Sequence, residues 1–512
     1  MTSTCALLAV TAKCLAVSAL GPADADLVDL PPSDVEELRL WPAALETGGI
    51  LALEVLWYEW QIELNKKDFD FARTWAGQRH RYERLYGLRF DNNTFGINMG
   101  HAYYNGSFYY DVARVLGGSF LESWLFTLAV STLWEMTIEH REVLSLNDTL
   151  VTPVGGAAIG EAFYQLGLLF ARGSPTVLNR VLTTLLSPAQ TVNDLAGLTH
   201  VTRTSDVDRF GLPSDVRHEL VLGVGYASST RGSSQHDATS EMELRLDTEL
   251  WNVSEYGHAG SVSRSLPAGA LSRVSVLYAL QRDELHDLRV FTEASVWGHY
   301  WQALGEGDDA LRGYALFAGV ATAFDMSIAR LPDVTDFLGA MHVVGPSVAA
   351  TWLAGSLRVD ARLAGYVDFA MVRSMAIDEL EATEVVGNTK SVLADERYTY
   401  ALGVTGLARL GARWRRVGVE VSWEQNGYDS VEGRDRYQQG STSPTGYVHQ
   451  GVVEDFNVRE ERRMWAGTLS LQLAHNVAVR ASAEDWMRRG SAKDVVALRR
   501  DRRGGVSLLG VF

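Results

Sequence analysis

The chain has 512 residues, of which 46% are hydrophobic and 21% charged, and its formal net charge is -17 at pH 7. This length allows two or three domains of ordinary size, or one large closed β-structure with a helical appendage. The basic residues form no sustained run, so a phosphate backbone would find little attraction and nucleic-acid binding is not expected.

The first 25 residues are expected to be a signal peptide. A short apolar stretch follows Lys13, and Ala23-Asp24-Ala25 has the small-x-small pattern of a cleavage site. Both cysteines, Cys5 and Cys14, lie in this segment. The mature protein would therefore have no thiol, no disulfide and no cysteine-ligated metal. The alternative is an N-terminal tail that is not removed.

Between residues 30 and 200 the apolar residues come in blocks of helical length. These blocks are 47–65, 107–116, 120–142, 157–172 and 175–195. Ser119 and Glu122 have the spacing of a capping box, and Ser174-Pro175 is typical of an N-cap followed by proline at the first helical position. No later block has the ~18 uninterrupted apolar residues of a membrane-spanning helix. The sequence predicts a helical domain over about residues 26–205.

From about residue 206 the apolar residues recur with a period of two. In residues 241–250 acidic and basic side chains alternate with Met242, Leu244, Leu246 and Leu250, and residues 357–369 and 417–424 repeat this split. Such segments are strands with one polar and one apolar face. They predict about twelve strands, near residues 216–228, 240–251, 270–282, 288–299, 312–325, 339–353, 356–371, 397–410, 416–427, 463–474, 477–486 and 503–512.

The lengths of the connections distinguish a membrane barrel from a soluble β-structure. Connections at 353–356, 410–416 and 474–476 are tight, whereas those at 375–396, 428–462 and 487–502 are long and polar. Short turns on one side, long loops on the other and an even number of strands are typical of an outer-membrane barrel. The aromatic residues Tyr398, Tyr400, Trp414, Trp423 and Trp465 are expected to form its interfacial girdle.

The end of the chain favours the same interpretation. Val506, Leu508 and Gly510 alternate behind a terminal Phe512, which resembles the C-terminal strand signal of outer-membrane proteins. The predicted fold is therefore α+β, with an N-terminal helical domain followed by an antiparallel transmembrane β-barrel of about twelve strands over 206–512. The alternative is a soluble periplasmic β-protein.

Residues 92–167 resemble a bacterial family known as domain of unknown function 3943. The segment departs from the family's pattern at Ala102, where the family usually has proline, so the turn after His101 is less constrained here. The resemblance implies an outer-membrane setting but no established reaction. The matching positions are Asn98, His101, Gly106, Ser107, Tyr109, Tyr110, Arg114, Trp134, Glu135, Glu139, Asp148, Thr152, Pro153, Gly156, Gly160 and Glu161.

Glu135 and Glu139 are the first candidates for a functional site. They are four residues apart in an expected helix, so both carboxylates project from one face. If that face is buried, the two like charges require a cation, a shared proton or a metal between them. Arg114 and Arg141 are candidate cations. The full candidate cluster is His101, Arg114, Glu135, Glu139, Asp148 and Glu161.

Three interpretations of this cluster remain open. It is a structural network that fastens the helices together, or it is catalytic, with one glutamate as general base and the other, or His101, as acid or orienting group. A His-Glu-Glu set also has ligand types suited to zinc or iron. However, no H-E-x-x-H or Glu-x-x-His spacing supports it, so no metal and no cofactor is predicted.

Together these features predict an outer-membrane protein with a structural or conduit role. Its helical domain would plug the barrel or be seated on it, in the lumen or the periplasm. The alternatives are an envelope-lipid-modifying hydrolase and a soluble periplasmic protein. The expected partners are outer-membrane lipid and, through the strand ending at Phe512, the barrel-assembly machinery.

Overall fold

The computed structural model describes residues 37–512 apart from several short stretches. These are 65–73, 84–87, 91–92, 141, 143, 232–237, 308–309, 332–333, 382–389, 396, 432–435 and 438–456. Helices occupy the chain up to residue 195 and the large sheet begins at residue 217, so the predicted domain boundary near residue 205 lies in the connection between them. The predicted signal peptide lies outside the described residues.

The helical domain is built from α-helices and two short π-helical turns. Its elements are α2 (Leu40–Leu64), α3 (Trp75–Tyr82), α4 (Phe95–Gly100), η3 (His101–Gly106), α5 (Ser107–Val115), α6 (Phe120–Leu133), η4 (Trp134–Ile138), α7 (Leu146–Arg172), α8 (Val177–Leu186) and α9 (Pro188–Leu195), with β1 (Leu88–Arg89) and β2 (Leu144–Ser145) paired in parallel.

Local signals explain several helix ends. The capping box is confirmed, because the Glu122 amide donates to the Ser119 hydroxyl at 3.3 Å and the Ser119 amide donates to the Glu122 carboxylate at 2.8 Å. The predicted cap at Ser174 is wrong, since the hydroxyl of Thr176 caps α8. The predicted block 175–195 is two helices, because Pro188 starts α9 at its first position.

The second half forms a closed antiparallel barrel of 12 strands. Its strands are β3 (Arg217–Arg231), β4 (Ala238–Trp251), β6 (Leu271–Gln281), β7 (Glu284–Glu306), β8 (Leu311–Arg330), β9 (Thr335–Ala354), β10 (Leu357–Arg373), β12 (Tyr398–Trp414), β13 (Val417–Ser430), β15 (Arg459–Ala474), β16 (Val477–Ala492) and β17 (Val495–Val511). β17 pairs with β3 and β7 with β8, which closes the ring.

All twelve predicted strands are present, and the large sheet has one further described strand, β5 (Gly260–Leu266), which pairs with the far part of β7. The prediction of a long loop over 487–502 is wrong. β16 and β17 instead continue as a paired ladder to a two-residue turn at 493–494. Charged residues in this stretch belong to the strands themselves, so polarity alone was a misleading signal for a loop.

The two faces of the barrel wall have opposite chemistry. Glu243 is 3% exposed and pairs in the lumen with Arg503 at 2.7 Å, whereas the next residue, Leu244, is 41% exposed on the outside. Val419 is likewise 49% exposed on the outside. A closed wall with apolar side chains outward and charges inward is the arrangement of an outer-membrane-type barrel and the reverse of a soluble β-protein.

The two ends of the barrel differ in their connections. At the end that we call the turn end, two-residue turns at 355–356, 415–416 and 475–476 lie with Phe512, and the longer excursion 252–270 contains β5. At the opposite end, the loop end, 374–397 and 431–458 connect the strands. The loop end also has the two-residue turns 282–283 and 493–494, so the separation of short and long connections is less strict than the sequence predicted.

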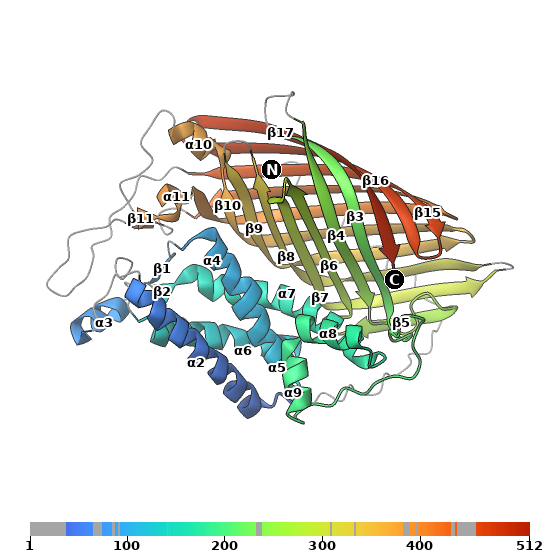
Figure 1. Cartoon of the computed structure of the whole chain (residues 1–512), viewed down its shortest axis with the longest axis horizontal. Coiled ribbons are helices and arrows are strands. Elements are labelled where there is room, and N and C mark those ends of the chain that lie inside the picture. The colour runs from blue at the N-terminus through green and yellow to red at the C-terminus, as the bar shows by residue number, and fades with distance from the viewer. Residues whose placement is uncertain are drawn as a thin grey trace.

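The helical domain lies along the outside of the barrel wall, as Figure 1 shows. The outward side chains Phe324 and Met341 pair across β8 and β9, and Met371 pairs with Tyr400 across β10 and β12. All four are buried in one core with residues of α4 and α7. We call this part of the wall, on β6 to β10 and β12, the covered wall. The helices α4 and α7 therefore pack against the outer face of the barrel wall, and none of the described residues of 37–195 lines the lumenal cavity.

Tyr398 and Tyr400 belong to the covered wall. The Asn98 side-chain amide donates to the Tyr398 hydroxyl at 3.0 Å and to the Tyr400 hydroxyl at 2.8 Å. Their predicted place in an interfacial girdle is therefore wrong, although Trp414 and Trp465 are 57% and 51% exposed, as a girdle requires.

Helix α7 forms the middle layer between the wall and the other helices. Among the described residues it is the one helix that is long and apolar enough to cross a membrane, and 78% of its apolar window is buried in the protein. Thr292 of β7 donates its hydroxyl to the Ala158 carbonyl at 3.1 Å. On its other side, Gly156 meets the backbone of Gly106, where neither residue leaves space for a Cβ atom.

Candidate functional site

The carboxylates at the centre of the candidate site come from a π-helical turn and from the start of an α-helix. Glu135 lies in the π-helical turn η4, and Glu139 is the residue that ends it. Asp148 is in the first turn of α7, where the Ser145 hydroxyl accepts a hydrogen bond from its amide at 3.1 Å. His101 begins the other π-helical turn, η3. Single π-turns inside helices are frequent at functional sites.

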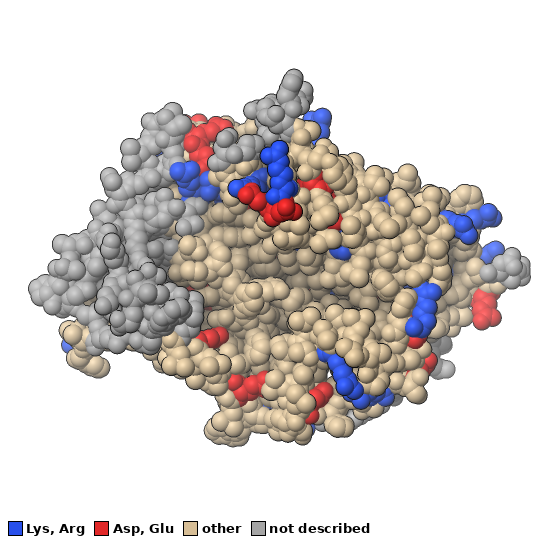
Figure 2. Space-filling model, in the orientation of Figure 1, with Lys and Arg blue, Asp and Glu red and all other residues tan. Residues whose placement is uncertain are grey.

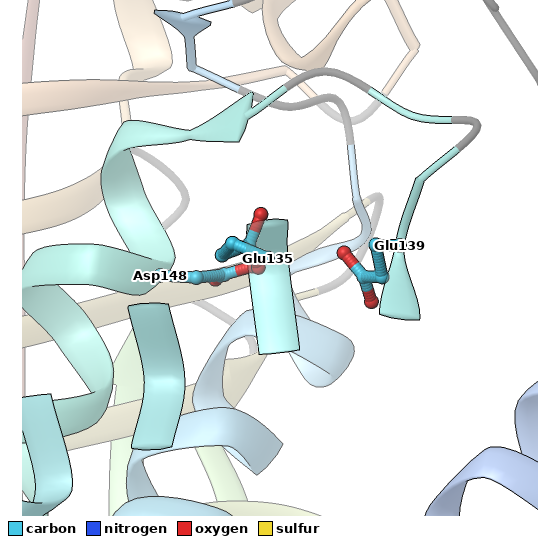
Figure 3. Close-up of side chains that lie close together, drawn as sticks. All are labelled: Glu135, Glu139 and Asp148. Carbon is cyan, nitrogen blue, oxygen red and sulfur yellow. The ribbon is translucent and has the colours of Figure 1, made fainter. Parts of the chain in front are cut away.

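Glu135, Glu139 and Asp148 form one buried group, which we call the acidic cluster. They are 3%, 9% and 1% exposed, and one ligand atom of each lies within 4.8 Å of the others. Figure 3 shows the Glu135 and Asp148 side chains next to each other, with Glu139 beside them. The sequence thus predicted the meeting of the two glutamates, and Asp148 joins them across the connection between η4 and α7.

Neighbouring donors hold each carboxylate in place. The Ser145 amide donates to Glu135 at 2.9 Å, and the Trp134 indole donates to Glu139 at 2.8 Å. The Nδ1 atom of His101 lies 3.3 Å from Asp148 Oδ1. The other oxygen of Asp148, Oδ2, is buried without a hydrogen-bond partner.

Arg81 supports the same region but was not predicted from the sequence. It is fully buried, and its guanidinium donates to the backbone carbonyls of Glu135 at 2.7 Å, Glu139 at 2.8 Å and Glu142 at 2.7 Å. It therefore caps the end of η4. No local pattern marks it, because α3 is a short helix far from the motif segment. Arg141, the predicted cation, lies outside the described residues.

Arg114 and Glu161 form a separate buried pair. The Arg114 guanidinium donates to Glu161 at 2.7 and 3.0 Å, and Glu161 also accepts from the Tyr110 hydroxyl at 2.7 Å and the Gln165 amide at 2.8 Å. Thirteen residues of α7 separate Glu161 from Asp148, a rise of about 20 Å. The structure therefore divides the predicted six-residue cluster into the acidic cluster with His101 and the Arg114–Glu161 pair.

The Arg114–Glu161 pair faces the barrel. A Cβ atom on Gly269, in the turn between β5 and β6, would overlap the Glu161 carboxylate and the Gln165 amide. The pair thus joins α5 and α7 at the point where a barrel turn contacts them.

The lumen of the barrel contains a cavity of 460 Å³. Arginine and carboxylate side chains from many strands line it, so its surface carries both charges. None of the lining residues belongs to the acidic cluster, which lies on the other side of the wall. The interpretation of that cluster as a hydrolase site stays a prediction. Ion pairs along the cavity include Arg273–Glu249, Arg480–Asp247, Arg409–Glu420 and Arg289–Glu484 at 3.2, 3.3, 3.3 and 2.7 Å.

The side chains that line the cavity are more exposed to solvent toward the turn end. Arg409 and Arg413 are 44% and 53% exposed at their side chains. Toward the loop end the inward side chains are buried: Leu338, Val372 and Tyr428 are at most 3% exposed, and the charged residues Glu460, Arg462 and Arg488 are at most 5% exposed. The lumen therefore narrows from a polar vestibule to a packed layer.

Helix α10 (Met375–Glu381) packs against β16 and β17 at the loop end. Its residues Ile377 and Leu380 are buried with Ala492 of β16 and Ala497 of β17, both of which point into the lumen. Beneath it lies a buried ion network, in which Arg488 donates to Glu460 at 2.9 Å and Arg462 lies 3.5 Å from Asp336. The segment 375–396, predicted as an outer loop, thus includes a helix that folds into the mouth of the barrel.

Comparisons with solved structures return outer-membrane channels at low similarity. The NanC porin is 12% identical and the alignment covers 56% of this chain and 98% of that chain, with a TM-score of 0.22. OmpT of Vibrio cholerae is 8% identical with coverages of 58% and 97% and a TM-score of 0.20. DcaP of Acinetobacter baumannii is 7% identical with the same coverages and a TM-score of 0.23.

No curated protein matches the chain. Residues 87–189, which contain both the acidic cluster and the Arg114–Glu161 pair, match the family model described as "Domain of unknown function (DUF3943)", so the resemblance carried by this segment is confirmed.

Proposed function

We propose that the protein is an outer-membrane conduit for small charged solutes, and that α10 holds it closed. The observation that carries the proposal is the lumenal cavity, whose walls present guanidinium and carboxylate groups in series. These groups can replace the water molecules around a charged solute, so the solute can form ion pairs or hydrogen bonds with successive side chains along the lumen.

The packed layer at the loop end makes opening a conformational step. α10 has seven residues, about two turns of helix, and is held by the side chains of Ile377 and Leu380 and by the Arg373–Asp378 ion pair at 2.7 Å. A helix of this length buries little apolar area compared with a strand of the barrel wall. Displacement of α10 is therefore the low-cost way to open the lumen, because the closed hydrogen-bonded wall stays intact.

The conductance of the purified full-length protein in planar bilayers tests this proposal. We expect low conductance in the wild type and a large increase in the double variant Ile377→Asp with Leu380→Asp, because two buried carboxylates force α10 out of the lumen. Glu379→Gln is the matched control, since Glu379 is exposed on the same helix and its replacement leaves α10 docked. Folded Asp variants that conduct no better than this control would remove the conduit proposal.

We further infer that the helical domain lies in the hydrocarbon layer beside the barrel. Among the described residues of 95–195, the exposed charged residues are Glu122, Arg180 and Asp194. The remaining exposed surface includes apolar faces, and Figure 2 shows mostly uncharged surface over the helices in that view. These faces include Leu121, Leu125 and Leu133 on α6 with Met136 on η4, and Val177, Leu178, Val181 and Leu185 on α8.

This inference also rests on position. The helices cover outward side chains of the same wall whose uncovered part, at Leu244 and Val419, faces lipid. A soluble domain rarely exposes apolar patches of this extent, whereas lipid is the natural solvent for them.

Cysteine accessibility tests the location of the helical domain. Single substitutions Leu125→Cys and Val181→Cys in membrane-inserted protein are expected to resist a membrane-impermeant maleimide, as does Leu244→Cys on the barrel. Arg416→Cys, in an exposed turn, is the water-accessible control. If the helical positions react as fast as the turn, the domain lies in water.

A further inference from the structure

A group of exposed arginine side chains lies on the outer face of the barrel, toward the loop end. They alternate along their strands with lumenal residues such as Arg488 and Arg503, which are 5% and 7% exposed, so they point away from the lumen. We give the name arginine patch to four of them on three neighbouring strands: Arg463 of β15, Arg489 of β16, and Arg500 and Arg502 of β17.

The strand register gathers the patch into one area of the wall. Met487 of β16 pairs with Arg463 on one side and with Arg500 on the other. Two interstrand spacings, about 10 Å, therefore separate the backbones of these two arginines. Arginine side chains are long enough to converge on one ligand across this distance.

The patch has more positive charge than its neighbours neutralise. Arg500 donates to both oxygens of Asp485 at 2.7 and 2.8 Å, and Arg502 donates to the same carboxylate at 3.3 Å. Arg463 donates to the Gln425 side chain at 3.4 Å, and among the described residues neither Arg463 nor Arg489 has a carboxylate partner. The charged residues on the outward faces of β13, β15, β16 and β17 are Arg459, Arg463, Arg489, Arg500 and Arg502 against Asp429, Glu461 and Asp485.

The patch lies at the depth of the lipid headgroups. Ten residues separate Arg502 from Phe512 at the turn end. At a rise of about 3.4 Å per residue and a tilt of about 40°, they are about 26 Å apart along the barrel axis, close to the roughly 25 Å of a membrane barrel's apolar band. Trp465 pairs with Asp485 beside the patch and is 51% exposed, as an interfacial aromatic residue is.

A groove runs along the outer wall next to the patch. Arg500, Arg502 and Trp465 contribute to its lining, together with the row of lateral partners Gly467, Ala483 and Gly504. The groove therefore extends from the guanidinium groups onto the apolar part of the wall. A ligand that fills it has a charged end and an apolar end.

We propose that the arginine patch binds a phosphate-bearing lipid of the leaflet at the loop end, which in an outer-membrane barrel faces the outside of the cell. Guanidinium groups donate paired, charge-assisted hydrogen bonds to phosphate oxygens. The excess of arginine selects an anionic headgroup, and the groove accommodates an acyl chain. This site lies outside the lumen, so it does not depend on the conduit.

Binding of lipid A to the purified full-length protein, followed by native mass spectrometry, tests the site. We expect the wild type to bind lipid A with two phosphate groups about tenfold or more tightly than dephosphorylated lipid A with the same acyl chains. The double variant Arg463→Gln with Arg502→Gln should lose this preference. Arg330→Gln is the matched control, because Arg330 is at the loop end of β8 and its side chain is 56% exposed, against 57% for Arg502.

Three outcomes would overturn the proposal. The wild type binds both forms of lipid A equally, or the double variant retains the preference shown by Arg330→Gln. Alternatively, a large excess of inorganic phosphate displaces lipid A completely, in which case the patch is a simple anion site. A dimer that the double variant abolishes would instead assign the patch to a second copy of the chain. All substituted side chains are exposed, so these variants are expected to fold.

Discussion

Replacing Arg114 with methionine is expected to destabilise the helical domain by about 3–5 kcal/mol. The substitution leaves the Glu161 carboxylate fully buried without its guanidinium partner, and the desolvation cost of that charge is then uncompensated. Urea unfolding followed by tryptophan fluorescence measures the change in the free energy of unfolding.

A double variant distinguishes the energetic cost of the unpaired buried charge from the cost of lost side-chain packing. Arg114→Met combined with Glu161→Gln should recover a large part of the loss, because a neutral amide replaces the isolated carboxylate and retains partners in Tyr110 and Gln165. Arg79→Met serves as the surface control, since the Arg79–Glu83 pair is exposed and contributes little. Equal effects of Arg79→Met and Arg114→Met would contradict the role given to the buried pair.

A substitution where α7 crosses the start of α5 should also destabilise the helical domain, by somewhat less than the loss of Arg114. Gly156→Ala is expected to cost about 1–3 kcal/mol, because the added Cβ atom must overlap the Gly106 backbone. Gly96→Ala should instead stabilise the helical domain by about 0.5–1 kcal/mol, since Gly96 lies in α4 with nothing within 4 Å of the new atom.

Replacing glycine with alanine is thus predicted to lower the free energy of unfolding at Gly156 and to raise it at Gly96. The same urea experiment compares them, and a change of the same sign and similar size at both positions would contradict the role given to close packing at Gly156. This crossing also explains why the motif segment has glycine at 106 and 156, since any side chain there would separate η3 from α7.

The acidic cluster shows how far local spacing carries a prediction. The i, i+4 relation of Glu135 and Glu139 was enough to predict that the two carboxylates meet. Spacing contained nothing about Asp148, which reaches them because the chain turns between η4 and α7. The predicted cluster also included Glu161, although the length of α7 places it about 20 Å from Asp148.

For the barrel, the sequence by itself determined the number of strands, their faces and the charged lumen. Each of these follows from side-chain alternation, which is a local property of a strand. What only the tertiary structure decided is what lies outside the wall. Phe324 and Leu244 belong to equally apolar outward faces, yet α7 and its neighbouring helices cover the first and leave the second exposed. Lipid and a packed helix are both apolar surroundings, so the alternation pattern is the same for either neighbour and does not distinguish between them.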